Sequence, residues 1–353
     1  MVRVVFKHSQ QEHQHPAVQY HVVFLPSLHN TPSNYHLSYF GTARIAVMVF
    51  TPDRDIPDLS GKVIIVTGGS SGLGKESVHQ LAKHNPARIF LSARTAARGN
   101  AAIADIENAT PSIKGKITFL EMDLASFSSV QRAAKAFIAQ ADRLDILMNN
   151  AGGMAQTAGL TEDGYEVHFG SNYMGPALFT RLLLPILQQT AALPESDVRV
   201  IDVNSESFRQ APPEGILLAK VKTDLSDVGS FARYGQSKLA GYYHSSNLAQ
   251  KTEGILFVAL HPGAVNTGIL DNLRKRRPYV GAVLGVLAGW VLTNVHQGAR
   301  AQLWASTAPK EDIRNGAFYN PSLKEYNYSI LTNAAQAQEI EDWTNAEFEI
   351  KGL

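Results

Sequence analysis

Two residues one helical turn apart, Tyr234 and Lys238, could do the most specific chemistry in this chain. The i,i+4 spacing places a phenol and an ammonium group on one face of a predicted helix. A unit charge about 4 Å away, at an effective dielectric constant of about 20, is worth about 4 kcal/mol. Such an effect lowers the pKa of the phenol close to neutral, where it can act as a general acid and base. Pairs of this spacing also arise by chance, but Ser205, directly after a predicted strand, can hydrogen-bond a substrate oxygen held near that phenol.

A glycine-rich turn at residues 67–74 follows the apolar run 62–66 and opens a predicted helix. Glycines allow a close approach of the backbone, and the N-terminus of a helix offers N–H groups and a partial positive charge. The ligand that such a turn usually holds is a dinucleotide pyrophosphate, although a plain tight turn is the alternative. The candidate binding residues are Gly68, Ser70, Ser71, Gly72, Leu73 and Gly74.

Three cations near the second predicted strand bear on the choice of cofactor. No acidic residue lies between Glu76 and Asp105, where a carboxylate would hydrogen-bond the ribose of NAD. Arg94 and Arg98 lie there instead, Lys75 lies in the first turn of the preceding helix, and guanidinium groups suit a 2′-phosphate. We therefore predict NADP(H) as the cofactor, with three solvated surface cations as the alternative.

Polar residues also follow the third and fourth predicted strands. Asp123 ends the third strand, and Asn149 and Asn150 end the fourth. Side chains beside a crevice can contact adenine and ribose, but they also commonly brace loops. Both interpretations stay open for each residue. A further turn, residues 261–267, closes the sixth strand at the same edge.

Strands and helices alternate along the body of the chain. Short apolar runs predict strands at 62–66, 88–91, 117–122, 144–148, 198–203 and 255–260. Helical patterns lie between them, at 96–108, 130–139, 179–187 and 234–250. This alternation predicts an α/β fold with a doubly wound parallel sheet of the Rossmann type. In such a fold the ligand crevice lies at the carboxyl ends of the strands. A single domain from about residue 55 to 350 accounts for all of these elements.

Composition excludes several function classes. The formal net charge of +1 gives no reason to expect a nucleic-acid partner. The chain has no cysteine, which excludes disulfides, thiolate metal sites and a cysteine nucleophile. That suits a reducing compartment, and we predict a cytoplasmic protein without a metal. No feature of the sequence sets an oligomeric state.

The first 47 residues differ from the rest. They carry six of the twelve histidines, several prolines and no sustained helical or strand period. We predict a disordered extension over residues 1–47 and a catalytic domain over residues 48–353. His13 and His15 offer only a weak alternative as a metal site. Met48 is a candidate for the natural start of the chain.

Taken together, these motifs resemble the short-chain dehydrogenase/reductase family, in its compact single-domain branch. The matching motifs, in the family's order, are residues 67–74, residues 149–152, Ser205, the Tyr234–Lys238 pair and Pro262-Gly263. Within the family the chain is similar to retinol-dehydrogenase-like enzymes and their fungal relatives. Residues 58–62, 81–86, 233–239 and 341–344 carry that likeness.

The resemblance implies a role for each matching position. Tyr234 would exchange a proton with the substrate oxygen, and Lys238 would lower its pKa and bind the nicotinamide ribose. Ser205 would orient the carbonyl or alcohol, and Asn172 would complete a proton relay through water. Val265 and Thr267 would meet the carboxamide of the cofactor. Arg181 matches a position that is often basic near the cofactor, although a surface cation is the simpler interpretation. The family usually has two serines after the fifth strand, and Asn204 replaces the first.

The family places its substrate lid after the sixth strand, here at about residues 268–295. Arg274 begins a basic cluster that ends at Arg277, and residues 279–292 carry no charge. That uncharged stretch is shorter than the roughly 20 residues of a membrane span. We predict an apolar lid over an apolar ligand, and a lid that also contacts a membrane surface is an alternative.

The predicted function is an NADP(H)-dependent oxidoreductase that interconverts an alcohol and a ketone or aldehyde on a hydrophobic small molecule. The likeness to fungal relatives points to secondary-metabolite biosynthesis. One alternative is a retinoid or lipid dehydrogenase that is peripheral on a membrane surface. The other is an NADP(H)-binding regulator without turnover. The intact set of Ser205, Tyr234, Lys238 and Asn172 argues against the regulator, because a site that has lost its activity tends to lose such residues.

Overall fold

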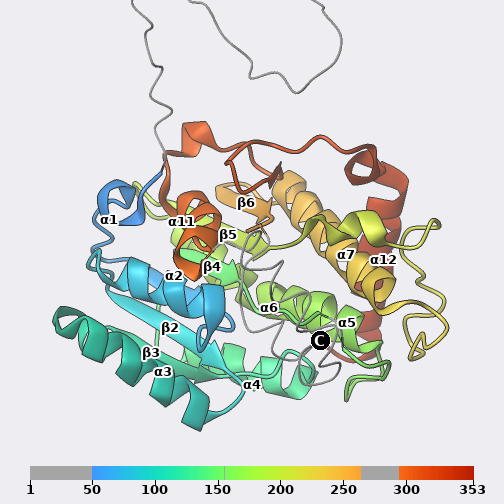
Figure 1. The fold of residues 1–353 in the computed structure, drawn as a ribbon, viewed down its shortest axis with the longest axis horizontal. Coiled ribbons are helices and arrows are strands. Elements are labelled where there is room, and N and C mark those ends of the chain that lie inside the picture. Colours follow the sequence, from blue (N-terminus) through green and yellow to red (C-terminus); the bar gives the residue numbers. More distant parts are fainter. Residues whose placement is uncertain (1–49, 155, 264–293) are drawn as a thin grey trace, which may run out of the picture. The chain divides into compact units, whose positions relative to one another are not determined.

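The computed structural model describes residues 50–154, 156–263 and 294–353. Its centre is a seven-stranded sheet in the order β3-β2-β1-β4-β5-β6-β7, in which every neighbouring pair is parallel (Figure 1). The doubly wound α/β fold predicted from the sequence is thereby confirmed. The strands are β1 (Val63–Val66), β2 (Arg88–Ala93), β3 (Ile117–Glu121), β4 (Ile146–Asn149), β5 (Val198–Val203), β6 (Ile255–Leu260) and β7 (Phe318–Tyr319).

Several predictions fall outside the described residues. The disordered extension over residues 1–47, Val265 and Thr267 belong to this group, as does the lid at 268–295 except for its last two residues. These remain predictions. Within the described part of the chain, none of the helices combines the length and the apolar character needed to cross a bilayer.

Helices cover both faces of the sheet, and each face has its own apolar core. One face packs against α2 (Gly72–Ala82), α3 (Ala96–Ala109) and α11 (Arg300–Thr307). The other packs against α4 (Phe127–Ile138), α6 (Gly175–Ala191), α7 (Ser230–Lys251) and α12 (Ala334–Ile350). Because both faces are buried, the strands are almost continuously apolar, as in Val63–Val66, where all four residues are buried.

Short elements complete the described fold. They are the helices α1 (Pro52–Asp55), α5 (Val167–Phe169) and α10 (Val295–Gly298), the π-helix η2 (Gly170–Met174), and the 3₁₀ helices η1 (Pro111–Ile113), η3 (Glu206–Gln210), η4 (Lys310–Asp312) and η5 (Ser329–Thr332). The π-helix leads directly into α6, so that helix begins at Gly175, four residues before the predicted start.

The strand order reverses between β1 and β4. The chain runs outward from β1 through β2 to β3, and then returns to β4 on the other side of β1. Helices on the two sides of such a switch point diverge, which leaves a crevice at the carboxyl ends of the two strands. The glycine-rich turn follows β1, and Asn149 ends β4, so both lie at this crevice.

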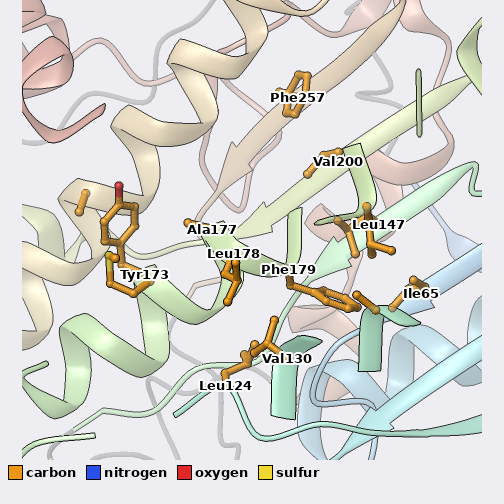
Figure 2. Close-up of a cluster of buried hydrophobic side chains, with 14 of the residues drawn as sticks. Ile65, Leu124, Val130, Leu147, Tyr173, Ala177, Leu178, Phe179, Val200 and Phe257 are labelled. Atoms are coloured by element: carbon orange, nitrogen blue, oxygen red, sulfur yellow. The ribbon is translucent and has the colours of Figure 1, made fainter. Parts of the chain in front are cut away.

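An apolar layer of side chains forms the floor beneath the carboxyl ends of the strands. Figure 2 shows Leu147, Val200 and Phe257 from three adjacent strands, with Leu178 and Phe179 of α6 near them. Because strand side chains alternate between faces, the next residues on this face are two positions further along each strand. They are Asn149, Asp202 and Ala259, which are paired in register across β4, β5 and β6. Asn149 and Asp202 therefore form a polar layer directly above the apolar one.

Candidate active site

A close approach of two segments brings Ser205 toward Tyr234. Tyr234 lies in the second turn of α7, and Ser205 caps η3 directly after β5. Gly235 makes the approach possible, because a methyl group at that position would lie 2.5 Å from the carbonyl oxygen of Ser207. The Ser205 Oγ accepts a hydrogen bond of 3.1 Å from the N–H of Ser207. Two residues that are 29 positions apart in the chain thus meet at one site.

Lys238 lies buried beneath the phenol of Tyr234. Its Nζ donates a hydrogen bond of 3.0 Å to the carbonyl oxygen of Val203 and lies 5.8 Å from the centroid of the Tyr234 ring. The Asn204 Nδ2 donates to the carbonyl oxygen of Lys238, at 3.0 Å, which ties α7 to the end of β5. Burial lowers the pKa of Lys238 to about 8, and the charge of Asp202 opposes that effect.

The pKa of Tyr234 differs from the expectation. Burial raises the pKa of Tyr234 to about 12, and a hydrogen bond with Ser205 opposes the rise. The prediction that Lys238 lowers this pKa close to neutral is therefore wrong for this structure. The physical reason is that the spacing argument omitted desolvation, which disfavours the phenolate. In addition, the Lys238 ammonium is directed at a backbone carbonyl.

Asn172 ties the loop after β4 to α7. Its Nδ2 donates to the carbonyl oxygen of Gly153 at 2.9 Å and to the Ser237 Oγ at 3.3 Å, and its Oδ1 accepts from the N–H of Gly153 at 2.8 Å. A methyl group at Gly152 would lie 3.5 Å from both the Asn172 Oδ1 and the Lys238 Nζ. Asn172 and Lys238 thus border the same backbone segment. The proposed relay through Asn172 stays a prediction.

The glycine-rich turn is packed too tightly for side chains. Gly68 and Gly72 have positive φ angles of 66° and 53°. A methyl group at Gly74 would lie 2.5 Å from the Asn150 Nδ2 and from the carbonyl oxygen of Gly68. Helices α3, α4 and α12 begin at residues whose side chains cap them, whereas Ser71, the N-cap residue of α2, makes no such bond. The first N–H groups of α2 are thus available to an anion such as a pyrophosphate, and Ser70 and Leu73 lie in the same turn.

Three of the predicted cofactor contacts brace the protein itself. The Asn150 Nδ2 donates to the carbonyl oxygen of Thr67, at 2.9 Å. The Asn149 Nδ2 donates to Thr180 Oγ1 at 3.0 Å and to Asp202 Oδ1 at 2.9 Å. The Asp123 Oδ1 accepts from the N–H of Ala125, at 3.0 Å. The sequence left open whether these side chains contact the cofactor or brace loops. Their hydrogen bonds in the structure support bracing.

The predicted cofactor cations do not all lie together. Arg94 is exposed just after β2 and makes no ion pair with any described residue. The Lys75 Nζ lies 2.7 Å from the Asp105 Oδ2, in a pair that is exposed to solvent. Arg181 points toward α12, where its Nη1 donates to the Asn345 Oδ1 at 3.1 Å and its guanidinium lies 5.7 Å from the Phe348 ring centroid. The structure thus does not bring Arg181 to the other site residues.

A buried ionic network beside Tyr234 was missed at the sequence level. Glu166 is fully buried, and its Oε1 accepts from His168 Nδ1 at 2.9 Å and from Arg233 Nη1 at 3.0 Å. The carbonyl oxygen of Gln156 accepts from Arg233 Nη2 at 3.2 Å, and its N–H donates to His168 Nε2 at 3.1 Å. The network pins the loop after β4 to the start of α7. The adjacency of Arg233 to Tyr234 was the one available signal.

The pKa of Glu166 reflects this network. Burial alone would raise the pKa of Glu166, but hydrogen bonds from His168 and from the N–H of Phe169 outweigh it and lower the pKa.

In the described part of the chain, no three His, Asp or Glu side chains gather in a way that could hold a metal ion.

Known proteins match this chain over most of its length. A family model described as short chain dehydrogenase matches residues 62–217. An uncharacterized oxidoreductase of Schizosaccharomyces pombe is 36% identical over 303 residues, which cover 84% of this chain and 87% of that protein. A short-chain dehydrogenase/reductase of Phomopsis amygdali is 40% identical over 278 residues, which cover 76% of this chain and 81% of that protein.

Solved structures match the fold. An uncharacterized protein from Mycobacterium paratuberculosis superposes with a TM-score of 0.62 at 25% identity, covering 82% of this chain and 96% of that one. The NADPH-bound carbonyl reductase from chicken fatty liver superposes with a TM-score of 0.57 at 23% identity. That likeness covers 76% of this chain and all of the reductase, and it shows the fold alone.

Proposed function

This chain belongs to the short-chain dehydrogenase/reductase family of oxidoreductases, and from that premise we propose its reaction. It is an NADP(H)-dependent enzyme that interconverts an alcohol and a ketone or aldehyde on a hydrophobic small molecule. The observation that carries the proposal is the meeting of Ser205, Tyr234 and Lys238 at the carboxyl end of β5, beside the switch-point crevice. On the likeness to fungal members of the family, we further propose a place in secondary-metabolite biosynthesis.

The residues at the switch point fit a dinucleotide. The uncapped N-terminus of α2 and the tight turn at Gly68 and Gly74 suit a pyrophosphate. The exposed Arg94 suits a 2′-phosphate. The Lys75–Asp105 pair is worth only about 0–1 kcal/mol because it is exposed, so Lys75 can exchange Asp105 for a phosphate. When bound, the nicotinamide ring of this cofactor gives or takes a hydride.

The side chains around Tyr234 handle the proton. A pKa of about 12 means that the phenol is protonated at neutral pH, so Tyr234 can donate its proton to a carbonyl oxygen during reduction. The Ser205 hydroxyl lies beside the phenol and can hydrogen-bond the same oxygen. The Lys238 ammonium, whose Nζ lies 5.8 Å from the centroid of the ring, then offsets part of the cost of forming a buried phenolate, although burial keeps the pKa of Tyr234 above its ordinary value.

The two alternative functions rest on less. A membrane-surface dehydrogenase depends on the basic cluster at 274–277, which lies outside the described residues. A regulator without turnover would not require Ser205, Tyr234 and Lys238 to lie together. Neither gains support from a contact in the described chain.

A substrate screen tests the proposed reaction. Apolar carbonyls and alcohols are incubated with the full chain and each of NADPH, NADH and their oxidised forms, and absorbance of the reduced cofactor is followed. We expect turnover of at least one apolar carbonyl, with NADPH preferred. Binding of NADPH without turnover of any compound would favour the regulator, and a clear preference for NADH would contradict the proposed cofactor.

A further inference from the structure

A small cavity lies beside Lys238, and Tyr234 is not among the residues that line it. It measures about 30 Å³ and is bordered by β4, β5, α6 and α7. Its polar lining includes Asn149, Asp202, Lys238 and His244. A cavity needs roughly 10–15 Å³ to hold one water, so this cavity accommodates about two waters.

The cavity exists because the helices present small residues to the polar layer of the sheet. Asn149 and Asp202 stand on the strands, one layer above the apolar floor of Figure 2. Ala177 of α6 and Gly241 of α7 border the space opposite them. A methyl group at Gly241 would find only the Asn204 Nδ2 within 4 Å, at 3.6 Å, so nothing else fills this position.

Several polar atoms around the cavity have unmet hydrogen-bonding capacity. The buried Asn149 Oδ1 and His244 Nε2 have no hydrogen-bond partner among the described residues. Of the three donors on the Lys238 ammonium, one is used by the carbonyl oxygen of Val203. A buried water typically makes two to four hydrogen bonds to such groups. The cavity is therefore suited to water that bridges Lys238 to its polar wall.

We propose that Asp202 is a positioning residue for the reaction, because its carboxylate faces Lys238 across this water-sized cavity and keeps the ammonium group charged. The inference rests on the proposed function, in which the Lys238 ammonium stabilises the phenolate of Tyr234. Asp202 itself is held by the Asn149 Nδ2, its register partner on β4, at 2.9 Å. It acts on Lys238 and does not contact the reacting atoms.

The other titratable groups near Lys238 carry no negative charge that could keep its ammonium group protonated. Burial lowers the pKa of His244, also on α7, to about 4, and burial with the charge of Lys238 lowers that of His261, after β6, to about 4. Both imidazoles are therefore neutral at neutral pH, and so is the Tyr234 phenol. Among the described residues facing Lys238, Asp202 supplies the negative charge.

Desolvation makes this charge necessary. Burial lowers the pKa of Lys238 to about 8, in spite of the opposing effect of Asp202. Burial raises the pKa of Asp202 above its ordinary value, and hydrogen bonds from Asn149 and Ser245 together with the nearby Lys238 charge oppose only part of that rise. Without the carboxylate, the ammonium would lose its proton near neutral pH and could no longer stabilise a phenolate.

The test follows the titration of Lys238 in the protein without cofactor or substrate. The chain is labelled with carbon-13 lysine, and the Lys238 signal is identified by its loss in Lys238→Met. We expect Asp202→Asn to lower the titration midpoint of Lys238 by about one pH unit or more. The matched control is Asp197→Asn, which removes the same charge at the opposite end of β5 and should leave the midpoint unchanged.

A measurement on the unchanged chain covers the case in which Asp202→Asn does not fold. The carboxyl carbon of Asp202, labelled with carbon-13, should report an ionised group throughout the range in which Lys238 titrates. A protonated Asp202 in that range would overturn the proposal, as would an unchanged midpoint in folded Asp202→Asn.

Activity gives a second readout. In Asp202→Asn the alkaline limb of the kcat/KM profile should move to lower pH by the same amount as the Lys238 midpoint. Since the titration needs no turnover, absence of any activity would refute the proposed function and leave the titration result intact. A shifted midpoint without a shifted profile would overturn the link between Asp202 and the reaction.

Discussion

Buried charged groups lie at both ends of β5, but their hydrogen-bonding capacity is met to different extents. At the amino end, Arg199 is 2% exposed, and each of its three guanidinium nitrogens has a hydrogen-bond partner. Its guanidinium donates to the Asp197 carboxylate at 2.6 Å and to the carbonyl oxygens of Ala305 and Ala308 at 3.0 and 2.6 Å. At the carboxyl end, Asp202 faces Lys238 across a cavity, and neighbouring polar atoms lack partners.

The difference distinguishes charges that only stabilise the fold from charges that act in the proposed reaction. A buried polar atom without a partner costs about 1–3 kcal/mol, so a fold retains one only where something else requires it. The amino end of the strand joins β5 to α11, and its charges have no further task. The carboxyl end leaves Lys238 and His244 free to bond with water and with groups that change during a reaction.

The largest effect is expected from the buried ion pair of Glu166 and Arg233 beside Tyr234. These two charges are paired with each other, unlike the charges at the carboxyl end of β5. Glu166→Gln leaves the buried Arg233 guanidinium without its counter-charge, which should destabilise the fold by about 3–5 kcal/mol. Urea unfolding at neutral pH measures this change. Glu162→Gln, an exposed neighbour, serves as the control and should change stability by less than about 0.5 kcal/mol.

The same variant has a defined pH dependence. The pKa of Glu166 lies below its ordinary value, so its stabilising contribution is complete above the ordinary carboxyl pKa. The contribution is lost as the pH falls through the lowered value. The difference in Tm between the two proteins should therefore shrink in acid, and a difference that grows in acid would contradict this account.

Tyr234→Phe should have the next largest effect, and it falls on activity. Removal of the proton donor should lower kcat by about a hundredfold or more and leave NADPH affinity within a few fold. Steady-state kinetics and fluorescence titration of NADPH measure the two quantities. Tyr243→Phe removes a phenol from the same helix, at a hydroxyl bonded to Ile330, and should leave kcat unchanged. Equal kcat values in the two variants would refute the assigned chemistry.

Arg199→Met sharpens the comparison from the amino end. It removes charge-assisted hydrogen bonds from a buried site, so stability should fall by about 2–3 kcal/mol while kcat per folded molecule stays constant. Denaturant unfolding and active-site titration measure these. Lys310→Met removes the more exposed partner of the same Asp197 and should cost at most about 1 kcal/mol. A fall in kcat on Arg199→Met would show that the two ends are coupled.

The smallest effect is expected at the two ends of β2. Arg94→Ser, after the carboxyl end, should reduce the preference for NADPH over NADH in kcat/KM by about tenfold or more, since a charge-assisted hydrogen bond contributes about 1.5–3 kcal/mol. Arg88→Ser, at the amino end of the same strand, should leave the preference unchanged. Equal preferences in the two variants would indicate that the 2′-phosphate is bound elsewhere.

Local patterns predicted the elements that depend on neighbours in the chain. The Tyr234–Lys238 spacing correctly predicted one helical face, and the glycines after β1 correctly predicted a tight turn. The two-residue strand β7 and the early start of α6 were not predicted. The strand β7 pairs with β6, which lies far from it along the sequence, and the start of α6 directly follows the π-helix at Gly170–Met174.

The sequence by itself determined six of the seven described strands, the doubly wound fold and the residue types at the ends of the strands, because strand periodicity, helix spacing and turn chemistry act over a few residues. Only the tertiary structure decided the charge states. The raised pKa of Tyr234 comes from burial, and the contacts of Asp202 with Asn149 and of Glu166 with Arg233 join residues 53 and 67 positions apart. Desolvation and long-range pairing depend on which distant segments exclude water from one another, and no local pattern encodes that.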